Sequence, residues 1–303
     1  MSNNNKIFVF TDVDLDGVTS LLVLHWVLGA KPGEIPFIST TVANFRKEFL
    51  KWAENDSINN YDKVYFLDLD TSTSVDLVDN TRSHIFDHHI THVNNKHVYK
   101  SAFTQIVETT SCAKVVYSFF KPVVTDSQKY LIGLGNDYDS YQFKLPDTYN
   151  LNCLFTNTQK TLDKTRSHKF IERFYNGFTQ FNSQENAIIK NYITDRDNVI
   201  NNLNIFTGYL PYNNINYKIV GTMSSKFVND VCDHLIKHHQ GDIVFSMNTN
   251  NNHVSWRKNK NTCPIDLSKL SAKLTEGGGH EYAAGGKVTE KFMEFTKTLT
   301  QEK

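Results

Sequence analysis

The sequence predicts an α/β protein with a larger N-terminal domain, a smaller C-terminal α/β domain and a helical linker between them. Apolar strand-like segments alternate with helical segments over about the first 140 residues, which is typical of a mostly parallel sheet. Helical periodicity alone then dominates residues 167–201, and the alternation resumes near residue 205. We therefore predict domains over 1–165 and 205–303, a linker over 166–204, and an active site in the cleft between the domains.

Four short apolar segments of the first domain are predicted strands, each followed by polar or turn-forming residues: 6–10, 36–40, 63–69 and 84–87. The helical segments between and after them are 17–29, 44–55, 111–120 and 125–135. Gly29 is expected to end the first helix. In the linker, Phe170, Phe174 and Phe178 recur every four residues, the spacing of a helix face that packs into a core.

The second domain begins with a predicted strand over 216–223 and a helix over 226–239. Two strands follow over 242–248 and 253–258, then a helix over 264–274 and the glycine-rich segment "GGGHEYAAGG" over 277–286. His25, inside the first apolar helix, is expected to be a hydrogen-bonded core residue.

Composition limits the possible functions. The chain has 303 residues with 39 % apolar and 13 % aromatic residues, sufficient for two cores. Because 32 basic residues balance 32 acidic ones, no overall positive field favours binding of long nucleic acid. The sequence shows no secretory leader, no apolar run near the ~18 residues of a membrane span, and four cysteines without paired spacing. We expect a cytoplasmic protein with no membrane association, and no obligate protein partner is evident.

Acidic residues gather where predicted strands and one helix of the first domain end. They occur in four segments: "FTDVDLDG" with Asp12, Asp14 and Asp16, "FLDLD" with Asp68 and Asp70, "FDHH" with Asp87, His88 and His89, and "GLGNDYDSY" with Asp137 and Asp139. Turn and capping roles explain any one segment alone. Because strand ends of a parallel sheet share one edge, the four together predict carboxylates that repel unless cations neutralise them.

Carboxylates combined with imidazoles suit Mn²⁺ or a similar divalent ion better than a metal that prefers thiolates. Two such ions ~3.5–4 Å apart are the common arrangement for hydrolysing phosphate esters. The residues therefore predict two divalent cations, Mn²⁺ in the first place with Mg²⁺ as the alternative, and a phosphoesterase reaction.

The four segments resemble the ordered motifs of the DHH phosphoesterase superfamily, and the first motif is similar to that of RecJ-type exonucleases, His-x-Asp-x-Asp-Gly. Asp12 stands here where that pattern has histidine. The resemblance implies a metal shell of these residues: Asp14, Asp16, Asp68, Asp87, His88 and either Asp137 or Asp139, with Asp12 as a further ligand. It also implies that Asp87, His88 and His89 are catalytic, with His89 behind the metal ligands or on the scissile phosphate.

The glycine-rich segment of the second domain allows backbone N–H groups to approach a phosphate closely. With "VSWRK" and "IDLS" before it, this segment resembles the DHH-associated substrate-binding domain. The resemblance implies a substrate site that includes Arg257, Gly278, Gly279, His280 and Ser224. Arg257 suits phosphate because its planar fork binds two oxygens at once. Ser224 is equally consistent with a helix N-cap.

The resulting hypothesis is a metal-dependent phosphodiesterase that removes nucleoside monophosphates from an end of single-stranded DNA or short oligonucleotides, as RecJ-type and nano-RNase-type enzymes do. A cyclic-dinucleotide phosphodiesterase or a nucleoside 3′,5′-bisphosphate phosphatase would use the same residues. A non-catalytic nucleotide-binding module is the alternative outside the enzymes, and Asp12 in place of histidine is its best support.

Overall fold

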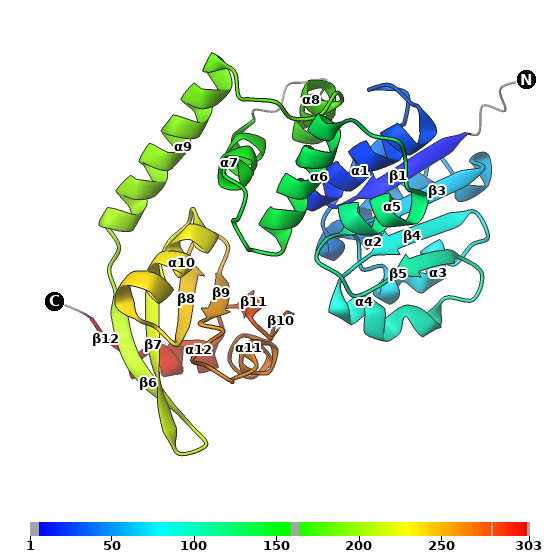
Figure 1. Cartoon of the computed structure of the whole chain (residues 1–303). Coiled ribbons are helices and arrows are strands. Elements are labelled where there is room, and N and C mark those ends of the chain that lie inside the picture. The colour runs from blue at the N-terminus through cyan, green and yellow to red at the C-terminus, as the bar shows by residue number, and fades with distance from the viewer. Residues whose placement is uncertain (1–5, 159–163, 280, 302–303) are drawn as a thin grey trace, which may run out of the picture. The chain divides into compact units, whose positions relative to one another are not determined.

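The computed structural model describes residues 6–158, 164–279 and 281–301. The chain forms two compact units, residues 1–189 and 190–303, which divide within one long helix. Figure 1 shows the elements of each unit along the chain. Among the described residues, no helix has both the length and the apolar character needed to cross a bilayer.

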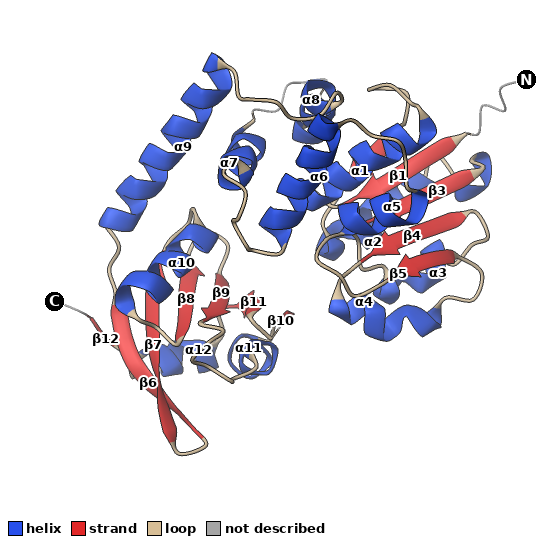
Figure 2. Ribbon diagram, in the orientation of Figure 1, coloured by secondary structure: helices blue, strands red, loops and turns tan. Residues whose placement is uncertain are grey.

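The first unit is built on a five-stranded sheet in which every pairing is parallel. Its strand order is β2-β1-β3-β4-β5, and Figure 2 shows β1, β3, β4 and β5 of this sheet. The strands are β1 (Ile7–Thr11), β2 (Phe37–Ser39), β3 (Lys63–Leu67), β4 (Ser83–Asp87) and β5 (Phe103–Ile106). The prediction of a mostly parallel sheet is confirmed. Sequence reasoning missed β5, a four-residue strand whose polar Thr104 and Gln105 interrupt any apolar run.

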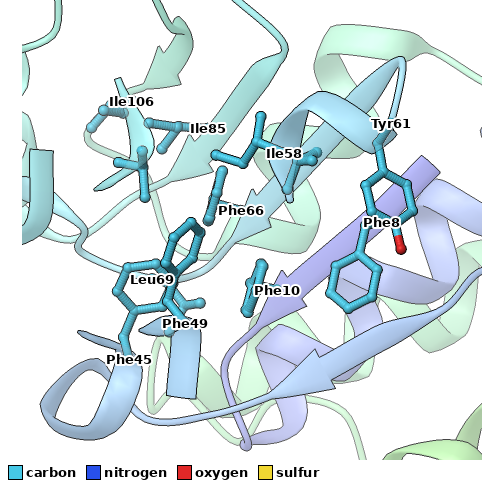
Figure 3. Packing of buried hydrophobic residues seen from close by; sticks show 12 residues of the cluster. Phe8, Phe10, Phe45, Phe49, Ile58, Tyr61, Phe66, Leu69, Ile85 and Ile106 are labelled. Atoms are coloured by element: carbon cyan, nitrogen blue, oxygen red, sulfur yellow. The ribbon is translucent and has the colours of Figure 1, made fainter. Parts of the chain in front are cut away.

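Helices cover both faces of this sheet. One face packs on α2 (Val42–Ala53), α3 (Val75–Val78) and α4 (Ile90–Asn95), and the other on α1 (Leu15–Leu28) and α5 (Cys112–Phe120), against which α6 (Asp126–Asp139) packs in turn. Short 3₁₀ turns occur at Ile58–Asn60, Ser72–Ser74 and Lys96–Val98. The core under α2 is aromatic: Phe10 stacks on Phe66, and Phe45 and Phe49 pack on both (Figure 3).

Helix α1 is buried from Leu15 to His25, so its apolar residues surround the whole helix and do not form one stripe. Gly29 ends it in the left-handed conformation, with φ 65°, as predicted. His25 is buried and its Nδ1 lies 3.1 Å from the carbonyl of Ala30, which confirms a hydrogen-bonded core histidine.

The prediction of helix throughout 167–201 is wrong in its middle. Helix α8 (Arg166–Phe174) ends before Gly177, and α9 (Ser183–Asn201) begins after the break; α7 (Thr148–Asn157) precedes both. Gly177 has φ +89°, and a Cβ there would lie 2.3 Å from the backbone of Ser127 and Gln128. The chain turns here because its backbone docks on the start of α6, where Phe178 donates to the Ser127 carbonyl at 3.0 Å. Phe178 is nevertheless buried with Phe170 and Phe174, as predicted.

The second unit is a mixed seven-stranded sheet in which only the β7–β8 pairing is parallel among the described strands. The order β10-β11-β9-β8-β7-β6-β12 comprises β6 (Phe206–Tyr212), β7 (Ile215–Met223), β8 (Ile243–Asn248), β9 (His253–Lys258), β10 (Gly278–Gly279), β11 (Ala283–Lys287) and β12 (Thr300–Gln301). Helix α10 (Val228–His239) covers one face, while α11 (Leu267–Thr275) and α12 (Glu290–Thr296) cover the other. The predicted smaller α/β unit is therefore present.

We expect Gly17→Ala to lower the free energy of unfolding by about 1–3 kcal/mol, because overpacked sites cost that amount. A Cβ at Gly17 would lie 2.5 Å from the carbonyl oxygen of Asp12, so the acidic loop before α1 would have to move. Urea unfolding followed by circular dichroism measures the change. The matched control is Gly133→Ala in α6, where the nearest atom is a leucine methyl at 3.4 Å. That variant should be neutral or slightly stabilised, and equal loss in both variants would contradict this reading of Gly17.

Candidate metal centre

The acidic segments of the first unit meet at the carboxyl edge of its sheet. The chain leaves β1 for β2 on one side and returns to β3 on the other, so the strand order reverses between β1 and β3. The register sets Thr11 beside Leu67 and Leu67 beside Phe86, which aligns the ends of β1, β3 and β4. Asp12 and Asp68 follow the ends of β1 and β3, and Asp87 is the last residue of β4. This is the crevice where α/β sheets bind ligands.

Two groups of side chains here could hold a cation, and His88 belongs to both. The first is Asp68, Asp87, His88 and His89, the second is Asp16, His88 and Asp139, and within each group the ligand atoms lie within 4.8 Å of one another. His88 Nε2 lies 3.3 Å from an Asp139 oxygen, 3.4 Å from Asp68 and 3.7 Å from Asp16. Residues 16, 68, 88 and 139 are therefore brought together from four distant parts of the sequence.

Asp68 is the residue whose surroundings most require a cation. It is buried, its backbone has φ 60°, and its Oδ1 has no hydrogen-bond partner among the described residues. Burial raises the pKa of Asp68 well above its ordinary value, and repulsion by Asp16 adds to the effect. A buried carboxylate oxygen without a donor is costly, whereas a divalent cation would satisfy it.

His88 is oriented by the backbone behind it. Its Nδ1 lies 3.3 Å from the carbonyl oxygen of Thr109, which accepts only if that nitrogen carries the proton. The tautomer assigned on this basis leaves Nε2 with a free lone pair facing the carboxylates. Burial lowers the pKa of His88, so the ring favours the neutral form that binds metals.

Asp87 is the hub of a buried hydrogen-bond network. One oxygen lies 2.8 Å from His89 Nδ1 and the other 2.6 Å from His92 Nδ1. Burial opposes ionisation of Asp87, but the hydrogen bonds from these two rings outweigh it and hold its pKa below the ordinary value. In turn, burial opposes the charge on His89, but the bond to Asp87 raises the pKa of His89 to about 9.

Sequence reasoning missed His92, which is fully buried. Its Nε2 lies 2.7 Å from the Tyr99 hydroxyl, which lies 2.8 Å from Thr71 Oγ1. His92 therefore ties Asp87 to a chain of polar groups beneath the site. The signal was present in "FDHHITH", since a histidine five residues after Asp87 lies one helical turn into α4.

The three aspartates after β1 have different surroundings. Asp14 caps α1, accepting from the Gly17 amide at 2.9 Å. Asp16 is buried and accepts from the amides of Cys112 at 2.5 Å and Ala113 at 3.0 Å, at the start of α5. Burial raises the pKa of Asp12 to about 7, and repulsion by Asp14 adds to it. Within the described part of the chain, Asp12 and Asp14 belong to neither ligand group.

The structure separates Asp137 from Asp139. The Asp137 carboxylate accepts from the amides of Lys144 and Leu145 and from the Thr148 hydroxyl at 2.6 Å. Burial opposes ionisation of Asp137, but these donors hold its pKa below the ordinary value. Asp139 lies instead beside His88, and burial, followed by repulsion from Asp16, raises its pKa to about 9. Of the two aspartates predicted as ligands, Asp139 belongs to a candidate ligand group, whereas the turn at 144–148 binds the oxygens of Asp137.

The donor set fits hard divalent cations. Oxygen and imidazole donors with no thiolate among the ligand groups suit Mn²⁺ or Mg²⁺. The residues that would hold the cations are Asp16, Asp68, Asp87, His88 and Asp139. Asp12 and Asp14 are close enough to contribute charge. Repulsion by Asp14 raises the pKa of Asp12, Asp16 and Asp139.

Binding of Mn²⁺ should strengthen from about pH 6 to pH 9 and release protons. Burial and mutual repulsion raise the pKa of Asp16 to about 7 and of Asp139 to about 9, so these groups hold protons that a cation must displace. Because these carboxylates bind protons more tightly folded than unfolded, the metal-free protein should lose stability as pH rises through the same interval. Calorimetry in buffers of different ionisation enthalpy counts the released protons; no release would contradict the raised pKa values.

The predicted substrate residues of the second unit have mixed surroundings. Arg257 donates to the Trp256 carbonyl at 2.8 Å and to Asn229 Oδ1 at 2.7 Å, which holds its guanidinium beside α10. Ser224 bonds to the backbone of Lys226, and the α10 cap position is Phe227, so Ser224 is not the helix N-cap. His280 lies outside the described residues.

Packing or backbone conformation requires glycine at every glycine position of "GGGHEYAAGG" except one. A Cβ at Gly277 would lie 1.9 Å from the Gly285 carbonyl, and Gly279 has φ +138°. Gly278 has neither a positive φ nor any atom within 4 Å of an added Cβ. Its lack of a side chain is therefore not required by the packing, and open space lies where the side chain would be.

The parallel sheet with its acidic and imidazole edge, together with the mixed sheet, is a fold that this chain shares with several solved structures. The sequence matches no protein-family model and no curated protein. Among solved structures, the chain is similar to the DHH domain of a member of the s1p family of ribosomal proteins, at 12 % identity and TM-score 0.64 over 97 % of this chain and 85 % of that one.

Two RecJ structures are also similar. RecJ from Thermus thermophilus in complex with Mn²⁺ matches at 14 % identity and TM-score 0.59, over 97 % of this chain and 51 % of RecJ. A structure of exonuclease RecJ bound to manganese matches at 13 % identity and TM-score 0.52, over 98 % and 89 % of the two chains. The shared fold extends over nearly all of this chain.

Proposed function

We propose that this protein is a phosphoesterase dependent on divalent cations, and that it hydrolyses single-stranded DNA or short oligonucleotides from one end. The observation that carries the proposal is the buried Asp68 oxygen without a donor among the described residues, set among Asp16, His88 and Asp139 at the switch point of the sheet. Clusters of like charge with raised pKa values occur where chemistry is performed more often than where stability alone is selected.

The proposed hydrolysis depends on charged groups at the sheet edge. Bound cations supply a nucleophile at neutral pH and neutralise the phosphoryl oxygens. Asp16, Asp68 and Asp139 would hold the cations, and Thr109 fixes the ring of His88 through its carbonyl. In the metal-free protein Asp87 raises the pKa of His89 to about 9, and the protonated ring would offer a positive charge and an N–H donor to a scissile phosphate oxygen.

The second unit supports an oligonucleotide substrate over inorganic pyrophosphate. Arg257 presents a fork held by Asn229, and Gly278 leaves open space beside the backbone, as close approach of a phosphate requires. A residue that binds a terminal group favours removal of nucleotides from an end. The balanced net charge favours short substrates.

Incubation of the protein with oligonucleotides labelled at the 5′ or the 3′ end tests this function. DNA and RNA strands of lengths from a dinucleotide upward, with Mn²⁺, Mg²⁺ or EDTA, report activity, sugar preference and polarity in one experiment. We expect stepwise release of nucleoside monophosphates with Mn²⁺ and none with EDTA. No cleavage of any strand by a protein that binds Mn²⁺ would contradict the proposal.

Arg257→Ala should raise KM by about tenfold or more with little change in kcat, because Arg257 would hold the substrate away from the bond that breaks. Arg257→Lys should recover only part of the loss, since an ammonium group cannot form the paired contacts of a guanidinium. The control is Arg46→Ala, which removes an exposed arginine paired with Asp76 on the first unit. An unchanged KM in Arg257→Ala would refute the binding role.

A non-catalytic nucleotide-binding module is the second candidate, and Asp12 favours it. Asp12 replaces the histidine of the RecJ-like pattern, and one of its oxygens accepts from the adjacent Val13 amide. In that case nucleotides would bind without hydrolysis, and Asp12→His would create activity. Cyclic dinucleotides and nucleoside 3′,5′-bisphosphates belong in the same substrate panel, because the same residues would act on them.

A further inference from the structure

A groove lies between the edge strand β5 and helix α5, and none of the candidate metal ligands lines it. Its volume is ≈ 330 Å³. Gln105, Val107 and Thr109 line one wall at alternate positions, which is the period of side chains on one face of a strand. The other wall and the end come from α5 and its C-terminus: Lys114, Val115, Ser118, Phe119 and Lys121.

β5 forms an open edge of the parallel sheet. Among the described strands, β5 pairs only with β4. The opposite edge is protected, because α8 lies on β2: Phe37 stacks on His168 with ring centroids 4.3 Å apart, and Ser39 bonds to Ser167 at 3.0 Å. Exposed strand edges invite pairing with another chain, and proteins usually cover or charge them.

Among the described residues, no other strand pairs with the outer side of β5. Val107 donates its amide to the Asp87 carbonyl of β4 at 3.1 Å. Because pairing groups alternate along a strand, the N–H and C=O groups of Thr104 and Ile106 point the other way, toward the open edge. These are the groups that a sixth strand would use.

Apolar side chains remain exposed around the same edge. Phe103 is 38 % exposed, Val107 36 % and Phe119 43 %, and the rings of Phe103 and Phe119 lie 5.4 Å apart. In a sheet with one further strand, residues of that strand would insert their side chains here, under α5. The groove lies where those side chains would be, and its lining residues alternate along the chain as residues on one face of a strand do.

The charges that line the groove indicate what kind of segment would bind there. Residues 103–121 contain two lysines, Lys114 and Lys121, both lining the groove, and one acidic residue, Glu108. A second copy of this chain, paired about a two-fold axis, would bring the same lysines together. An extended segment that carries acidic side chains beside apolar ones complements both the lysines and the exposed apolar surface.

We propose that the β5–α5 groove binds an extended, acidic and apolar segment of a partner protein, which pairs with β5 as a sixth strand. The partner's backbone pairs with Thr104 and Ile106, its apolar side chains enter the groove against Val107 and Phe119, and its acidic side chains reach Lys114 and Lys121. The proposed interaction does not rest on the proposed hydrolysis.

The test uses the full chain and a fluorescent probe, an acetylated and amidated heptapeptide of alternating glutamate and valine, measured by anisotropy. Binding should slow hydrogen exchange at the amides of Thr104 and Ile106. Lys114→Glu combined with Lys121→Glu should weaken binding by about tenfold or more. Thr104→Pro should have a comparable effect, since proline removes one outward N–H and is tolerated on an edge.

Controls separate strand pairing from attraction by charge alone. Lys51→Glu reverses an exposed charge on α2 and should leave binding unchanged. Of two probes N-methylated at every valine or at every glutamate, at least one must lose binding. Circular dichroism confirms that each variant folds. The proposal is overturned if Thr104→Pro binds the probe as the parent does, or if sedimentation shows the chain pairing with itself through β5 and Thr104→Pro dissolving that dimer.

Discussion

Asp68→Asn should reduce turnover by about 10³-fold or more while making the metal-free protein more stable. The activity falls because the amide oxygen that replaces the carboxylate carries no net charge for a cation, and losses of that size follow removal of one centrally placed electrostatic group. The stability rises because burial and repulsion from Asp16 disfavour the Asp68 charge in the folded protein. Asparagine also tolerates the left-handed backbone at this position, where φ is 60°.

The gain in the free energy of unfolding should be about 1–3 kcal/mol without metal, and it should disappear when Mn²⁺ is added. Thermal unfolding with EDTA and with Mn²⁺ measures both effects. Asp70→Asn is the matched control, because Asp70 lies two residues on and its oxygens accept from Ser72 and Thr91. A metal-free Asp68→Asn protein that is less stable than the parent would refute the view that this carboxylate is kept for a cation.

Replacement of the two aspartates at the end of α6 should affect different properties: metal binding and turnover for Asp139, and the free energy of unfolding for Asp137. Asp139→Asn should weaken Mn²⁺ binding and turnover by about 10²-fold or more and leave the fold intact, since Asp139 faces His88 and has a pKa raised to about 9. Asp137→Asn should lower the free energy of unfolding by about 2–3 kcal/mol, because an amide nitrogen would face donors in place of an oxygen that accepts.

The pH dependence distinguishes these roles. The pKa of Asp137 is lowered in the folded protein, so its contribution to stability is complete above the ordinary carboxylate pKa and is lost as pH falls through the folded value. The stability difference between the parent and Asp137→Asn should therefore be full at neutral pH and shrink below about pH 4. If Asp137→Asn instead removed metal binding without destabilising the protein, the two roles would be reversed.

Local sequence contains most of the information about elements and their faces. The apolar runs that become β1, β3 and β4 sit between helical segments, and that alternation predicts a parallel sheet because crossovers must return to the same edge. β5 was missed because an edge strand is half exposed and has no continuous apolar run. The break before α9 was missed because Gly177 turns there to dock on Ser127, a contact distant in sequence.

The sequence by itself predicted that carboxylates and imidazoles gather at one edge of the sheet, because strand ends of a parallel sheet share that edge. Tertiary structure decided which contacts each of these side chains makes. "GNDYDSY" offers Asp137 and Asp139 equally, and only the turn at 144–148, which binds Asp137, leaves Asp139 for the cluster. The segment "FLDLD" does not predict that Oδ1 of Asp68 lacks a hydrogen-bond partner among the described residues. The local sequence does not predict the hydrogen bond between His92 and Tyr99 either. Hydrogen-bond satisfaction and burial are set by groups far along the chain, so they emerge only when the strands align.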